Sequence, residues 1–178
     1  LTEELSGKDV ANVFCSPLRR ARETAAAFSS RMVPTEELRE LGMGAWEGLT
    51  FDEIRARFPV LYAKRGEAPF TCCPAGGELP ADCLARVCGA LTRILKSTEG
   101  DVAIVAHAGV NRLLLCSLLG RDMNEFLSIP QPYGCINALC CDGEAVTLAE
   151  TGRAPHPVLT PSLCERLMEA AGTPLPVR

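Results

Sequence analysis

Three arginines follow the first apolar run of the chain. The run is ANVFC, residues 11–15, and the next residues, SPLRRARETA, contain Arg19, Arg20 and Arg22. The run predicts a buried strand, and Ser16 with the proline after it predicts a helix start. Cations in the first turns of a helix oppose its dipole, so a bound phosphate or carboxylate would remove the conflict. Solvated surface charge is the alternative, which we favour for Arg19 and Arg22.

A second reactive group stands at the end of another apolar run. His107 follows DVAIVA, residues 101–106, and precedes Ala108 and Gly109, which are small enough to let the backbone approach a ligand closely. On the pattern alone, a hydrogen-bonded core histidine and a functional histidine are equally good interpretations. Two strand ends that each deliver a cationic or hydrogen-bonding group to a helix N-terminus favour an anion site containing Arg20 and His107.

Strands that alternate with helices predict an α/β fold that positions these groups. DVAIVA is apolar enough for a strand buried on both faces of a parallel sheet. Further strands are expected within residues 35–41 and in a hairpin around residues 142–143. Helices are expected over residues 80–96 and from Thr50, where Thr50 and Glu53 form a capping box. The second of these should stop before Pro59, and residues 59–80 should be irregular.

Composition excludes several classes of function. The net charge of −4 does not favour binding to nucleic acid or to an anionic membrane, and no apolar run is long enough to span a bilayer. The 10 cysteines are scattered, without a Cys-x-x-Cys pair, and several lie in apolar runs such as LLLCSLL and INALCC. We interpret them as small core residues of a reduced, cytoplasmic protein, and we expect no metal site and no cofactor.

Four ordered motifs resemble one family. VFCSPLRRARETA, LRELGMGAWEGLTFDEI, PAGGE and VAIVAHAGVNR are similar to the histidine phosphatase superfamily, which is phosphoglycerate mutase-like, and most similar to α-ribazole phosphatases and related small phosphatases. The resemblance covers about residues 1–151. It implies a three-layer α/β/α fold with a mostly parallel mixed sheet, and a small phosphorylated metabolite as substrate.

The resemblance also implies a role for individual residues. Arg20 matches the phosphate-binding arginine, Glu40 matches the proton donor to the leaving group, and His107 matches the second histidine, which stabilises charge on the phosphoryl oxygens. The backbone at Ala108 and Gly109 matches the segment that closes around the phosphate. Such chemistry is sensible, because charge in the transition state needs fixed donors and the leaving oxygen needs a proton.

Other acidic residues are weaker candidates. Glu36 and Glu37 are interpreted as surface carboxylates. Glu78, at a usually acidic position in PAGGE, is interpreted as part of the loop structure.

The nucleophile of the family is missing from this sequence. It belongs to an Arg-His-Gly motif at the end of a central first strand beside the strand that ends at His107, and no such motif occurs here. His156, between prolines, is no substitute. We expect the motif to precede residue 1 in the intact protein, so that residues 1–178 alone are inactive. We also consider three alternatives. The segment was lost by cleavage, or the protein is an inactive module that binds a phosphoester or a partner, or it is a phosphoglycerate mutase.

The ends of the chain differ in character from its centre. LTEEL at the start is typical of the last turn of a helix, which indicates part of a longer protein. Residues 152–178 are expected to form a proline-rich linker and a short helix, which could begin a further domain. Nothing in the sequence indicates an oligomeric state.

Overall fold

A parallel three-stranded sheet forms the centre of the structure, a computed structural model that describes residues 10, 12–142 and 145–153. Its strands are β1 (Asn12–Cys15), β2 (Met32–Pro34) and β3 (Val102–Val105), in the order β2-β1-β3. Because the strands are parallel, β1 and β3 end at the same edge, where the Ser16 N–H donates to the Val105 carbonyl at 2.9 Å. This edge carries the site.

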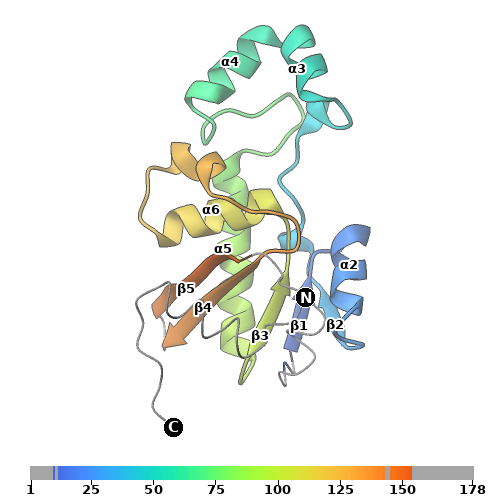
Figure 1. The fold of residues 1–178 in the computed structure, drawn as a ribbon, viewed down its shortest axis with the longest axis vertical. Coiled ribbons are helices and arrows are strands. Elements are labelled where there is room, and N and C mark those ends of the chain that lie inside the picture. Colours follow the sequence, from blue (N-terminus) through green and yellow to red (C-terminus); the bar gives the residue numbers. More distant parts are fainter. Residues whose placement is uncertain (1–9, 11, 143–144, 154–178) are drawn as a thin grey trace, which may run out of the picture.

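A separate antiparallel hairpin follows the helices. It consists of β4 (Ile136–Asp142) and β5 (Ala145–Arg153), which confirms the predicted hairpin, although residues 143–144 lie outside the described part. In Figure 1 it lies beyond β3, on the side opposite β1. Among the described residues β3 pairs only with β1 and β4 only with β5, so the strands expected in one mixed sheet form two.

Helices cover both faces of the parallel sheet. Helix α2 (Arg19–Ala26) packs Ala25 against Val13 and Cys15 of β1. The next side chain of β1, Phe14, points to the opposite face, where it lines a cavity together with Ile94 of α5 (Pro80–Ser97). The α/β class with a layered arrangement is therefore confirmed.

The main hydrophobic core lies where α5 meets α6 (Ala108–Leu118). It contains buried side chains of both helices and of the 3₁₀-helix Met123–Ser128, with Leu113, Cys116 and Phe126 among the most deeply buried. This packing fixes the N-terminal turn of α6, which bears the site, relative to α5.

Two helices, α3 (Phe51–Arg57) and α4 (Pro59–Glu67), lie together away from the sheets (Figure 1). The capping box is confirmed, with the Glu53 N–H donating to the Thr50 Oγ1 at 3.3 Å and the Thr50 N–H donating to the Glu53 carboxylate at 2.9 Å. The prediction of an irregular segment from residue 59 is wrong at its start, because Pro59 occupies the first position of α4, where its missing N–H costs no hydrogen bond.

Other local predictions also need correction. The strand expected within residues 35–41 lies earlier, at Met32–Pro34, and Glu36–Leu38 form a 3₁₀-helix instead. Strand β3 is only partly covered, with Ile104 36% exposed, because β3 is an edge strand among the described residues. Helix α2 begins at Arg19, with Leu18 rather than Ser16 as its N-cap.

The cysteines divide between core and surface. All nine described cysteines are free thiols. Cys15, Cys83 and Cys116 are fully buried, as predicted, and burial raises the pKa of Cys83 to about 12. The prediction is wrong for Cys140 and Cys141, which are exposed on β4.

Candidate active site

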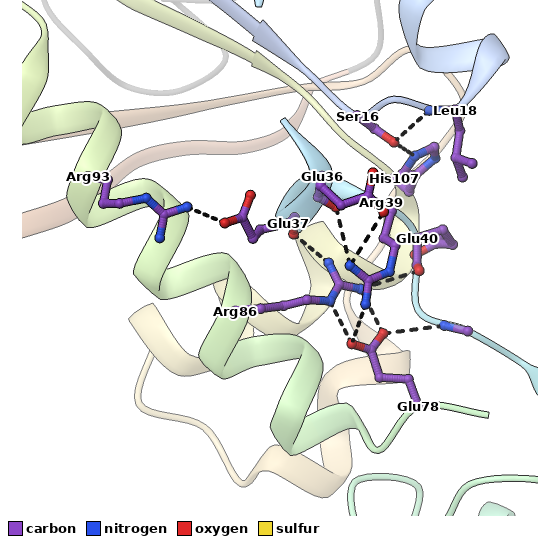
Figure 2. Close-up of polar contacts among 11 residues, drawn as sticks. Ser16, Leu18, Glu36, Glu37, Arg39, Glu40, Glu78, Arg86, Arg93 and His107 are labelled. Atoms are coloured by element: carbon purple, nitrogen blue, oxygen red, sulfur yellow. Dashed lines mark hydrogen bonds and ion pairs between the residues drawn. The ribbon is translucent and has the colours of Figure 1, made fainter. Parts of the chain in front are cut away.

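His107 is the N-cap residue of α6, and its imidazole is buried between two polar side chains. The Arg20 Nε donates to the His107 Nδ1 at 3.2 Å. The His107 Nε2 lies 2.7 Å from the Ser16 Oγ (Figure 2). Because Nδ1 accepts a hydrogen bond, the neutral ring carries its proton on Nε2 and donates it to Ser16. The structure thus brings together Arg20 and His107, which are 87 residues apart in the sequence.

Burial controls the charge of this imidazole. It lowers the pKa of His107 below the ordinary value of 6.5, the negative charge of Glu40 raises the pKa, and the positive charges of Arg20 and Arg86 lower it. The net shift is downward. His107 is therefore neutral at pH 7, which agrees with the acceptor role of Nδ1.

We expect a nuclear magnetic resonance titration of the imidazole protons to give His107 a midpoint below 6.5. Because its pKa is lower in the folded chain than in the unfolded chain, His107 contributes stability that is complete above about pH 6.5 and is lost as the pH falls through the folded pKa. The chain has 2 histidines, so a His107→Gln variant assigns both signals. A midpoint at or above 6.5 would contradict the buried neutral ring.

Arg20 leaves most of its guanidinium available. Its side chain is exposed, and among the described residues only its Nε has a hydrogen-bond partner. It lines a cavity of about 390 Å³ together with Arg39, Glu40 and Glu47. By contrast, Arg19 is 89% exposed and forms an ion pair with Glu23 of the same helix at 2.7 Å. The terminal N–H groups of Arg20 can therefore receive an anion.

Glu40 lies against the first turn of α6. Its carboxylate accepts hydrogen bonds from the backbone N–H groups of Leu41 at 2.9 Å, Val110 at 3.2 Å and Gly109 at 3.3 Å. A Cβ atom at Gly109 would lie 2.6 Å from the Glu40 Oε1, so glycine is required for this approach. Ala108, the first residue of α6, separates Gly109 from His107. The five residues predicted for the site thus lie at one end of the sheet.

An arginine of α5 fixes the backbone that carries Glu40. The Arg86 side chain is 12% exposed and forms two hydrogen bonds with the Glu78 carboxylate, at 2.6 and 2.7 Å. It also donates to the backbone carbonyls of Glu37 and, at 3.3 Å, Glu40 (Figure 2). The hydrogen bonds from Arg86 are the main cause of a lowered pKa of Glu78, so this carboxylate stays ionised at neutral pH.

Sequence reasoning missed two residues of this arrangement. Ser16 was assigned to capping, but its hydroxyl accepts from the Leu18 N–H at 3.2 Å and bonds the His107 ring. Arg86 was not singled out, although it lies one turn from the buried Cys83 and Ala90 on α5, an unusual position for a charge. His156 lies outside the described residues.

Two negative observations concern the described part of the chain. Nowhere in residues 10, 12–142 and 145–153 do three or more His, Cys, Asp or Glu side chains cluster in a way that could hold a metal ion. No helix within these ranges has the length and apolar character needed to cross a bilayer.

Comparison with known families identifies the scaffold. The model of the histidine phosphatase superfamily (branch 1) matches residues 1–153. The chain belongs to this superfamily. The resemblance seen in the four sequence motifs is therefore confirmed for the superfamily.

Individual relatives and solved structures are also similar to this chain. Phosphoserine phosphatase 1 of Hydrogenobacter thermophilus is 31% identical over 143 residues, covering 78% of this chain and 66% of that enzyme. The structure of YhfR from Bacillus stearothermophilus has a TM-score of 0.80 and 29% identity, with 86% of this chain and 79% of that chain covered. The α-ribazole phosphatase of Shigella flexneri has a TM-score of 0.68 and 25% identity, with 77% and 70% covered.

Proposed function

We propose that the intact protein is a phosphomonoester hydrolase that works through a phosphohistidine intermediate. The observation that carries the proposal is the convergence of Arg20, His107 and Glu40 at the end of β1 and β3. The Arg20–His107 hydrogen bond of 3.2 Å joins a guanidinium with free donors to a buried neutral imidazole. Glu40 stands beside them at the N-terminus of α6.

In the first step a histidine nitrogen attacks the phosphorus atom, and the bond from phosphorus to the ester oxygen breaks. Arg20 binds the phosphoryl oxygens through its terminal N–H groups, and His107 stabilises their charge in the transition state. Glu40, when protonated, gives its proton to the departing oxygen. The leaving group departs as an alcohol.

In the second step water attacks the phosphohistidine. The Glu40 carboxylate takes a proton from the water, the nitrogen–phosphorus bond breaks, and inorganic phosphate leaves. The nucleophilic histidine is proposed to lie upstream of residue 1, on a strand that pairs with the open edge of β3. Support comes from that edge, which has no strand partner among the described residues and which ends next to His107.

The decisive experiment traps the intermediate. The full-length protein is mixed with a ³²P-labelled phosphomonoester, quenched in alkali, and digested for mass spectrometry. We expect an acid-labile, alkali-stable phosphoryl group on a histidine that precedes residue 1. We expect no turnover by residues 1–178 alone, because the proposed nucleophile is not among them.

Two outcomes would reject this mechanism. A phosphoryl group found on His107 itself would exchange the proposed roles, and hydrolysis by residues 1–178 alone would show that no upstream histidine is needed. Replacing the upstream histidine with alanine gives the matched control, since it should abolish labelling while Arg20 and Glu40 stay in place.

The substrate is proposed to be a small phosphorylated metabolite, since the cavity beside Arg20 measures about 390 Å³. The similar enzymes are named for different phosphoesters, phosphoserine and α-ribazole phosphate, so their names do not identify the alcohol part of the substrate.

The protein is proposed to act in the cytoplasm. The nine described cysteines support this location, because all of them are free thiols. Residues 1–151 are proposed as part of the phosphatase domain, and residues 152–153 continue β5 of the same domain. The linker and short helix expected within residues 152–178 otherwise lie outside the described residues.

A further inference from the structure

Arg39 places a second guanidinium in the cavity that contains Arg20. It precedes Glu40 in the chain and lines the same space of about 390 Å³. Its side chain is 42% exposed. The cavity is therefore lined by two arginines from different segments, Arg20 from α2 and Arg39 from the loop before Glu40.

Arg39 has only loose contacts with its neighbours. It forms ion pairs with the carboxylates of Glu36 and Glu78 at 3.7 Å, a separation beyond hydrogen-bond distance. Within the described ranges, the one hydrogen bond of its side chain goes to the Glu36 backbone carbonyl at 3.4 Å. A guanidinium has five N–H donors, so most of its hydrogen-bonding capacity is unused.

The nearby carboxylates are poorly placed to accept hydrogen bonds from the unused N–H groups of Arg39. Both oxygens of Glu78 are bound by Arg86, at 2.6 and 2.7 Å. Glu36 is 69% exposed and does not line the cavity. The Glu40 carboxylate is engaged by backbone N–H groups, and Glu47 accepts from the Met43 N–H at 2.8 Å. The cavity therefore has unused cationic donors, while its own acidic groups are occupied.

We propose that Arg39 binds a carboxylate of the substrate, so that the preferred substrates are phosphomonoesters of hydroxy acids. The proposal rests on the proposed function, because it takes Arg20 as the ligand of the phosphoryl group. Arginine suits the second anion because its planar fork matches a carboxylate with two parallel hydrogen bonds. Arg39 then determines specificity without taking part in the bond-breaking step.

The test uses two pairs of substrates that differ in the carboxylate. O-phospho-L-serine is compared with O-phosphoethanolamine, which lacks only that group, and 3-phosphoglycerate is compared with glycerol 3-phosphate. In the full-length protein we expect kcat/KM for at least one substrate with a carboxylate to exceed that of its pair member without one by about 10-fold or more. In Arg39→Gln the preference should vanish through a rise in KM of about 10- to 100-fold for the carboxylate substrate. For the two substrates without a carboxylate and for an aryl phosphate, kcat/KM should change less than about threefold.

Arg19→Gln is the matched control, because it removes the same charge from a side chain that is 89% exposed. Arg39→Lys should restore part of the preference, since it keeps the charge and loses the fork. Equal losses on all substrates would assign Arg39 a structural role, and unchanged kinetics on all of them would remove it from the site. Each result would overturn the proposal.

Equilibrium binding separates this proposal from the proposed function. If the full-length protein hydrolyses no phosphomonoester, the proposed function fails, and calorimetric titration with the same four compounds still tests Arg39. A carboxylate-dependent affinity that Arg39→Gln abolishes would support the Arg39 site, whereas equal affinities for the members of each pair would reject it.

Discussion

Replacing Arg20 with alanine is expected to lower kcat/KM of the intact protein towards an aryl phosphate by about 10²- to 10³-fold. In the proposed mechanism Arg20 supplies terminal N–H donors to the phosphoryl group, and its Nε donates to the His107 Nδ1 at 3.2 Å. The variant loses an anion ligand and also the group that orients the imidazole. Because Arg20 is exposed, its removal should leave the fold intact. Steady-state kinetics measures kcat/KM, and circular dichroism checks the fold.

His107→Gln gives a second variant at the same contact. Its amide can still donate to the Ser16 Oγ, which lies 2.7 Å from the His107 Nε2. Its flexible chain does not hold an acceptor at the fixed position of the ring Nδ1, to which Arg20 donates. We expect a loss of similar size, and the double variant should be little worse than either single change, because the two side chains act together. Arg19→Ala should keep full activity. Wild-type rates in Arg20→Ala or in His107→Gln would remove these residues from the mechanism.

Replacing Arg86 with leucine is expected to lower the free energy of unfolding by about 3 kcal/mol. The Glu78 carboxylate, with a side chain 17% exposed, would lose both of its hydrogen bonds from Arg86. The backbone carbonyls of Glu37 and Glu40 would lose a donor. Chemical denaturation measures the change. The loss should shrink below about pH 4, because the lowered pKa of Glu78 contributes stability above the ordinary value of 4.5 that disappears as the carboxylate is protonated.

Two further variants separate stability from positioning. Arg93→Leu, on the same helix, removes a pair with Glu37 whose side chains are 61% and 37% exposed, and it should cost at most about 1 kcal/mol. The double variant Arg86→Leu/Glu78→Leu should recover much of the stability lost in Arg86→Leu, because the unpaired carboxylate is gone. It should not recover kcat, since the carbonyl of Glu40 remains without its anchor. Full recovery of kcat would mean that Arg86 acts only on stability.

Patterns that depend on near neighbours in the sequence predicted much of the fold. The apolar runs at β1 and β3, the amphipathic helix α5 and the capping box at Thr50 each have a period or spacing that a single segment displays. The convergence of Arg20 and His107 also followed, because parallel strands end at one edge of a sheet. The assignment of Glu40 came from the resemblance to the family.

Contacts between distant segments were not predictable in this way. Ser16 has the residue type of an N-cap, but its bond to His107 spans 91 residues, and no local rule reports such a contact. The contacts of Arg86 are equally remote, since they reach residues 37, 40 and 78 across two loops. The error at Pro59 has a local cause. A proline ends the helix before it but can also occupy the first position of the next helix, so the sequence did not predict α4.

One edge of β3 has no strand partner among the described residues, and this has a consequence for the protein's behaviour in the cell. Its sequence, Val-Ala-Ile-Val, contains no lysine or proline of the kind that natural edge strands use to discourage association, and Ile104 is 36% exposed beside it. Any extended chain, including a nascent copy of the same protein, can compete for that edge. Mutations in the segment that covers this edge would therefore promote aggregation before they alter the chemistry at His107. Their first visible effect would be a lower yield of soluble protein and the formation of inclusion bodies.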